Sequence, residues 1–146
     1  MSNFVDLLDA VIRVRQGENR AAALELINRV NGRVVKQAEI ASISYTIFRR
    51  AFQHTIQNMM TPPVDTPVEG HIDREIPVES IIDDPQPDPL DNVPYNFIYV
   101  IPCLDEMEND ITPFTVAGAT YDMVIRFIPV AGIPYAMQRT IRIECV

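Results

Sequence analysis

The chain has 146 residues, of which 47% are hydrophobic and 22% charged, a balance that excludes a wholly disordered protein. A single domain of this length buries about two thirds of its unfolded surface, so it needs no disulfide or structural metal to fold. The formal net charge of −8 opposes binding to phosphate backbones and anionic lipid, which argues against nucleic acids and membrane surfaces as partners.

Residues 1–10 predict a short helix or an N-terminal arm. Ser2 and Asn3 are residue types that cap helices, and helical spacing follows them at Phe4, Leu7, Leu8, Val11 and Ile12. No basic leader precedes an apolar block, so the start does not have the pattern of a secretory signal. No apolar run reaches the ~18 residues that a membrane span requires. We therefore expect a soluble product made in the cytoplasm.

Residues 11–28 are compatible with two kinds of secondary structure. Strong helix formers in RAAALELINRVNG, ending at Gly32, favour a helix. Alternation of apolar and polar residues in VIRVR and LELIN favours two strands joined by a polar turn. We predict a β-hairpin with strands at residues 11–15 and 22–28.

The segment SISYTIF predicts a half-buried strand. Its β-branched and aromatic residues favour extended backbone, and its apolar side chains occupy alternate positions. Ile43, Tyr45 and Ile47 are expected to face the core, opposite a polar face formed by Ser42, Ser44 and Thr46.

A proline- and acid-rich region at about residues 60–94 is predicted to form loops. All twelve prolines follow residue 61, and residues 61–112 contain thirteen acidic residues against one base, Arg74. Proline lacks the N–H that a sheet interior needs. Between the loops, residues 74–82 predict a short edge strand that Pro77 interrupts.

The C-terminal third predicts three strands. Residues 95–102 have apolar side chains on both faces, which predicts a central strand covered on both sides: Phe97, Tyr99 and Ile101 against Ile98 and Val100. Alternation in TYDMVIRFIP and YAMQRTIRIECV, joined by PVAGIP, predicts a β-hairpin. Its core-facing residues are Tyr121, Met123, Ile125 and Phe127 in the first strand, and Tyr135, Met137, Ile141, Ile143 and Cys145 in the second.

The two cysteines, Cys103 and Cys145, form no CxxC or zinc-ligand spacing. In a reducing compartment we expect two buried thiols. Both residues close apolar strands, which leaves a disulfide between them open.

Acidic residues in two predicted loops supply the oxygen ligands that calcium prefers. They are Asp83, Asp84, Asp88 and Asp91 in one loop, and Asp105, Glu106, Glu108 and Asp110 in the other. A sandwich that brought both loops to one end would form a multi-carboxylate site. Their order is not that of an EF-hand, and acids in loops mostly serve solubility, so we assign no metal-binding residues.

No catalytic pattern is present. His54 and His71 stand in polar surroundings without a GxSxG, HExxH or cysteine–histidine arrangement, and we expect them to be surface residues. The five glycines form no phosphate-binding loop, so we assign neither catalytic residues nor a cofactor. Aromatic residues that could stack on a sugar alternate along strands, which favours core packing instead: Phe97, Tyr99, Tyr121 and Phe127. Met59 and Met60 could contact a partner or plug an end of the domain.

Read in order, VIRVRQGENRAAALELINRVNGRVVKQAEIASISYTIFRR resembles the opening of an immunoglobulin-like module of tailed-phage virion proteins, including the N-terminal module of baseplate upper proteins. PVESIID, DNVPYNFIYVIP and FTVAGATYDMVIRFIPVAGIPYAMQRTIRI are similar to small uncharacterised phage-like proteins. The resemblance covers most of the chain and implies an all-β, immunoglobulin-like antiparallel β-sandwich over residues 11–146. Residues 1–10 would be an added arm or short helix. The chain lacks the tryptophan and the paired inter-sheet cysteines of antibody domains.

The resemblance implies a non-enzymatic structural component of a bacteriophage particle, in the capsid surface, neck or tail. Its expected location is the virion, and its expected partners are other virion structural proteins or further copies of itself. Residues 1–10 or the loop region 60–94 would reach onto a neighbour. The alternative is a binding module for a host glycan or surface protein, in which calcium could take part.

Overall fold

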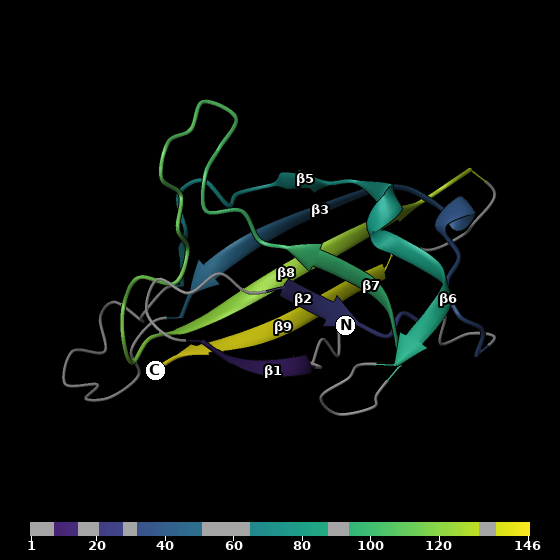
Figure 1. Ribbon diagram of the computed structural model, residues 1–146, viewed down its shortest axis with the longest axis horizontal. Helices are drawn as coiled ribbons and strands as arrows, with labels where there is room; N and C mark the ends of the chain where they lie inside the picture. Colours follow the sequence, from purple (N-terminus) through teal and green to yellow (C-terminus); the bar gives the residue numbers. More distant parts are fainter. Residues whose placement is uncertain (1–7, 15–20, 28–31, 51–64, 88–93, 132–136) are drawn as a thin grey trace, which may run out of the picture.

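The computed structural model describes residues 8–14, 21–27, 32–50, 65–87, 94–131 and 137–146, with residues 8–13 described by their backbone alone. In these ranges the chain forms nine strands and two short 3₁₀ turns, η1 (Gln37–Glu39) and η2 (Val78–Ser80). Figure 1 shows the strands arranged in two layers.

The larger sheet has the strand order β1-β9-β8-β3-β4, and β5 pairs with β3 next to β4. Its strands are β1 (Leu8–Val14), β3 (Ile40–Arg49), β4 (Thr66–Pro67), β5 (Arg74–Ile76), β8 (Thr120–Pro129) and β9 (Met137–Cys145). β1 runs parallel to β9, and the other pairs are antiparallel.

The smaller sheet has the order β2-β7-β6 and is antiparallel throughout. It consists of β2 (Ala21–Leu24), β6 (Ile81–Pro87) and β7 (Pro94–Val100). The two sheets pack face to face, so the predicted all-β sandwich is confirmed. The orders β9-β8-β3-β4 and β2-β7-β6 are those of strands GFCC′ and BED in variable-type immunoglobulin domains.

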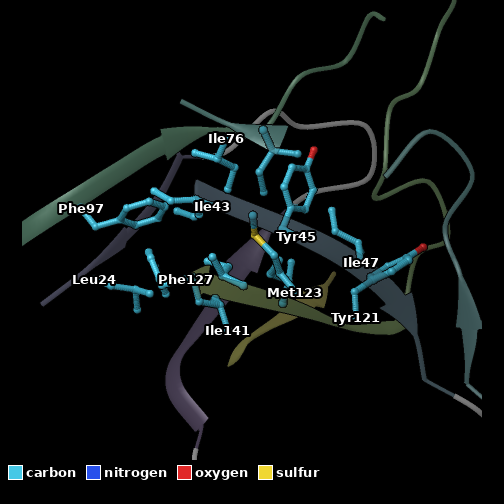
Figure 2. Close-up of a cluster of buried hydrophobic side chains, with 14 of the residues drawn as sticks. Leu24, Ile43, Tyr45, Ile47, Ile76, Phe97, Tyr121, Met123, Phe127 and Ile141 are labelled. Atoms are coloured by element: carbon cyan, nitrogen blue, oxygen red, sulfur yellow. The ribbon is translucent and has the colours of Figure 1, made fainter. Parts of the chain in front are cut away.

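The core lies between the two sheets, and Figure 2 shows part of it. β3 contributes Ile43, Tyr45 and Ile47, which are at most 2% exposed, as the alternation in SISYTIF predicts. The smaller sheet contributes Phe97, whose ring meets that of Phe127 edge to face, with centroids 5.4 Å apart. This aromatic pair joins the two layers.

The predicted C-terminal hairpin is confirmed. β8 and β9 pair over eight residue pairs, from Thr120 opposite Glu144 to Phe127 opposite Met137. All four core-facing residues predicted in β8 are buried, and so are Ile141, Ile143 and Cys145 of β9. Met137 is half-buried, and Tyr135 lies outside the described residues.

A tyrosine near the start of β8 holds the end of the segment that connects β7 to β8. Tyr121 is 2% exposed, and its hydroxyl accepts a hydrogen bond from the backbone N–H of Val116, 3.3 Å away and five residues upstream. The tyrosine corner of immunoglobulin domains has this arrangement at the corresponding corner. Met123, two residues further on and fully buried, stands where antibody domains have the second cysteine of the inter-sheet disulfide.

The hairpin predicted for residues 11–28 is wrong. β1 and β2 belong to different sheets, because β1 pairs with the C-terminal strand and β2 pairs with β7. Local alternation specifies extended backbone but not the partner of a strand. The helical alternative also fails for residues 8–14 and 21–24, where burial of Ala22 and Leu24 in the core overrides the helix propensity of the alanines. Residues 8–10, assigned from the sequence to the N-terminal arm, begin β1.

The loop prediction for residues 83–94 is wrong up to Pro87, where β6 lies, and at Pro94, where β7 begins. β6 is the edge of its sheet and carries Pro85 and Pro87, and an edge tolerates proline because only one of its sides needs N–H donors. Its pairing with β7 is irregular between Ile81 and Gln86. The predicted edge strand at residues 74–82 is divided: β5 ends before Pro77, and the chain crosses through η2 to the other sheet.

β7 is the central strand of the smaller sheet, as predicted, but its outer face is partly exposed. Ile98 is 36% exposed and Val100 is 59% exposed. In the described part of the chain their cross-strand neighbours on β2 are Ala23 and Ala21, which are too small to shield them. Apolar residues on both faces of a strand therefore do not by themselves imply cover on both sides.

Candidate functional site

The described residues of the two acidic clusters that could have formed a calcium site lie far apart. Asp83 and Asp84 are on β6, beside the beginning of β7, whereas Asp105 and Glu106 are in the loop that follows the end of β7. In Figure 1 the two regions lie at opposite ends of the sandwich. No group of three or more potential metal-ligating side chains occurs in the described ranges, which leave out Asp88 and Asp91.

Several of these carboxylates are already hydrogen-bonded within the protein. Asp105 accepts bonds from its own loop that lower its pKa, chiefly from the Asn109 backbone and side chain. The Thr112 hydroxyl and N–H lower the pKa of Asp110 in the same way. Asp83 accepts a bond of 2.7 Å from the backbone N–H of Gln37. These acids therefore stabilise turns.

His71 is not a surface residue, and that prediction is wrong. It is fully buried, and its Nε2 lies 2.5 Å from the carbonyl oxygen of Ile111. Since a carbonyl only accepts, Nε2 carries the proton and Nδ1 of the neutral ring accepts from the Tyr45 hydroxyl at 2.7 Å. His71 thus connects β3 to the loop after β7. His54 lies outside the described residues.

Burial controls the ionisation of this pair. Desolvation lowers the pKa of His71 below its ordinary value, assisted by the nearby charge of Arg74. Desolvation also raises the pKa of Tyr45, so its hydroxyl stays protonated and available as a donor.

We expect acid to destabilise the fold through His71. A histidine whose folded pKa is depressed takes up a proton on unfolding, so stability is complete above the unfolded pKa of about 6.5 and declines as the pH falls toward the folded pKa. In that window the slope approaches about 1.4 kcal/mol per pH unit. Urea unfolding measured between pH 7.5 and pH 5 tests this.

The matched variant is His71→Gln, because glutamine supplies one donor and one acceptor without titrating in this range. Its unfolding free energy should depend less on pH than that of the wild type. Equal pH slopes for the two proteins would contradict the assignment of the acid sensitivity to His71.

The two cysteines are free thiols, and the disulfide alternative is wrong. Cys103 follows the end of β7, whereas Cys145 closes β9 in the other sheet. Cys145 is buried, which raises the pKa of its thiol, and its Sγ lies 3.7 Å from the carbonyl oxygen of Phe114. A protonated thiol in this position is a packing group.

The aromatic residues are core residues, as their alternation indicates. Phe97, Tyr121 and Phe127 are buried, and Tyr99 packs against them with its ring centroid 5.5 Å from that of Tyr45. None of the four offers an open stacking platform. Met59 and Met60 lie outside the described residues.

Residues 103–111, here called the Met107 loop, form a tightly hydrogen-bonded projection. The Ile111 N–H donates to the Cys103 carbonyl (2.8 Å), and the Asp105 N–H donates to the Asn109 carbonyl (3.0 Å). The Asp105 carboxylate accepts from the backbone N–H groups of Met107 and Asn109, both at 2.9 Å. The loop is therefore preorganised by its own bonds.

The tip of this loop exposes an apolar side chain between two acids. Met107 is 82% exposed, the highest value among the described large hydrophobic residues. Its neighbours are Glu106, whose side chain is also 82% exposed, and Glu108, which is exposed and has a left-handed φ of 63°. Figure 1 shows the segment after β7 projecting beyond the strands near β5.

The Met107 loop is fixed to β5 and to the segment before it. Near the tip, Glu106 pairs with Arg74, the first residue of β5, at 2.9 Å. At the base, His71 holds the Ile111 carbonyl. The Ile111 side chain also packs over Gly70, where an added Cβ would come within 2.5 Å of it. Sequence reasoning missed this arrangement, although an apolar residue inside an acidic run, DEMEND, was a visible signal.

A second surface lies on the outer face of the larger sheet, here called the β3–β8 groove. It is a cavity of about 240 Å³ lined by Ser44, Tyr45, Thr46, Phe48, Pro67, Ile72, Asp73, Val124 and Arg126. Small-molecule pockets are usually larger, about 300–1,000 Å³. The small volume and the mixed lining, with apolar residues beside one guanidinium and one carboxylate, favour a protruding side chain as the occupant.

No family model, curated protein or solved structure matches this chain. In the described part of the chain there is no helix with the length and hydrophobicity to cross a bilayer.

Proposed function

We propose that this chain is a non-enzymatic structural component of a bacteriophage particle, acting in the capsid surface, neck or tail by protein–protein contact. The observation that carries the contact function is the Met107 loop. A rigid loop loses little entropy on binding, and a large apolar side chain held in water gains from burial in a partner. The phage assignment is supported by the resemblance of its strand segments to virion modules.

The environment of two buried titratable side chains also favours a contact function over catalysis. The buried side chains of His71 and Tyr45 bond to each other, His71 also bonds to backbone, and burial suppresses the ionisation of both groups. A general base needs access to a substrate proton. These two groups serve instead to fix the base of the Met107 loop.

The proposal is tested on particles purified by density gradient from a culture that produces the phage carrying this gene. Quantitative mass spectrometry should find the chain in the particle band at a fixed ratio to the major capsid protein. A chain found solely among soluble proteins, and absent from the particle band, would overturn the proposal.

A further inference from the structure

The outer face of β8 carries an exposed arginine, Arg126. Asp122 on this face is held between Arg50 and Arg142, at 3.4 Å and 3.1 Å. Four residues further along the strand, Arg126 makes no ion pair or hydrogen bond with any residue that the structure describes. Its cross-strand neighbours, Ser44 and Gln138, are neutral. Its charge is therefore available to an acid from outside.

Apolar side chains surround this arginine. Val124 and Ile128 flank it on the outward-facing side of β8, and Ile128 is 40% exposed. Phe48 of β3 and Ile72, just before β5, form further apolar walls of the β3–β8 groove, and Ile72 is 53% exposed. The surface thus combines one cation with a shallow apolar depression.

The Met107 loop has the complementary composition. Its tip, Glu106-Met107-Glu108, is one apolar side chain flanked by two acids. The groove combines apolar lining residues with the hydroxyl groups of Ser44 and Thr46, one carboxylate and one guanidinium. Asp73 lies on the β5 side of β3 and Arg126 on the opposite side. Repulsion by Asp73 therefore directs an incoming acid toward Arg126.

We propose that the β3–β8 groove of one copy receives the Met107 loop of a second copy, with Met107 in the depression and Glu108 paired to Arg126. The Met107 loop and the β3–β8 groove are different surfaces of the same chain, so the contact between two copies is head-to-tail, or heterologous. Repetition of a heterologous contact generates a ring or an open filament. The inference rests on the proposed function and deepens it by naming the partner as the chain itself.

The experiment is sedimentation velocity on the purified full chain at concentrations up to about 1 mM, at low and high salt. The wild type should self-associate with increasing concentration, and less so at high salt. Arg126→Glu and Met107→Ser should each weaken association at least about tenfold, because they remove the ion pair or the buried apolar side chain.

Charge reversal supplies the decisive variant. Arg126→Glu combined with Glu108→Lys restores opposite charges across the contact, so the double variant should regain association that Arg126→Glu loses. Arg33→Glu and Val146→Ser make the corresponding changes at exposed residues outside the groove and the loop, and should associate as the wild type does. Far-ultraviolet circular dichroism checks that every variant keeps its strands.

A wild type that stays monomeric throughout, an Arg126→Glu variant that associates normally, or a double variant that fails to recover overturns the inference. These outcomes leave the particle test unaffected. A chain present in particles but monomeric in sedimentation would support the proposed function and overturn the contact between copies.

Discussion

Replacing Asn96 with alanine is expected to lower the free energy of unfolding by about 3–5 kcal/mol, since each buried group that loses its hydrogen-bond partner costs about 1–3 kcal/mol. Asn96 is fully buried in β7. Its Oδ1 accepts from the Leu26 N–H, and its Nδ2 donates to the carbonyl oxygens of Leu26 (3.3 Å) and Val35 (3.1 Å). Alanine would leave these backbone groups buried with fewer partners.

The position of Asn96 explains the size of this effect. The backbone pairing of β2 with β7 ends at Leu24 opposite Phe97. Beyond it, the side-chain amide of Asn96 replaces the backbone partner and hydrogen-bonds to the backbone of Leu26. Val35, on the far side of the turn before β3, is held by the same side chain. One amide therefore fixes the connection between the two sheets.

The measurement is urea unfolding followed by tyrosine fluorescence and circular dichroism, because the chain has no tryptophan. The matched control is Asn109→Ala, which removes an exposed side-chain bond to Asp105 and should cost less than about 1 kcal/mol. Similar losses for the two variants would contradict the bridging role of Asn96.

Replacing Phe97 with alanine is expected to cost about 3–5 kcal/mol, the usual range for a buried phenylalanine. Phe97 is fully buried, and its ring plane makes an angle of 82° with that of Phe127 on the facing sheet. Truncation would remove this contact and leave a cavity between the layers. Because domains of this size are stable by about 5–15 kcal/mol, the variant should lose a large share of its stability.

The next residue in the strand provides the control. Ile98 points to the outer face and is 36% exposed, so Ile98→Ala should cost about 1 kcal/mol or less. Thermal and urea unfolding of the two variants test the difference. Equal destabilisation would mean that the layer between the sheets is not the main source of stability.

The alternation of apolar and polar residues predicted the buried side chains correctly in strands with one solvent-exposed face and one buried face. The alternation in β3, β8 and β9 identifies their buried residues because side chains point to opposite faces with a period of two. The same pattern fails for Asn96, which lies outside the alternation of Phe97 and Tyr99 and is buried by a connection rather than by the facing sheet.

The candidate site was harder to predict because its parts come from distant segments. The acids of DEMEND suggested calcium ligands, but the Asp105 carboxylate accepts hydrogen bonds from within the loop and Glu106 pairs with Arg74, while Met107 is left exposed. His71 gave no sequence signal of burial, since its environment is made by Tyr45 and by Ile111, 26 and 40 residues away.

The amino-acid sequence alone determined the all-β class, the final hairpin and the inward faces of three long strands, because these depend on side-chain alternation along each strand. Only the tertiary structure decided that β1 joins β9 in parallel, that β5 and β6 separate into different sheets, and that His71 is buried. Those features depend on hydrogen bonds and burial between segments far apart in the chain, and local pattern does not specify which segments meet.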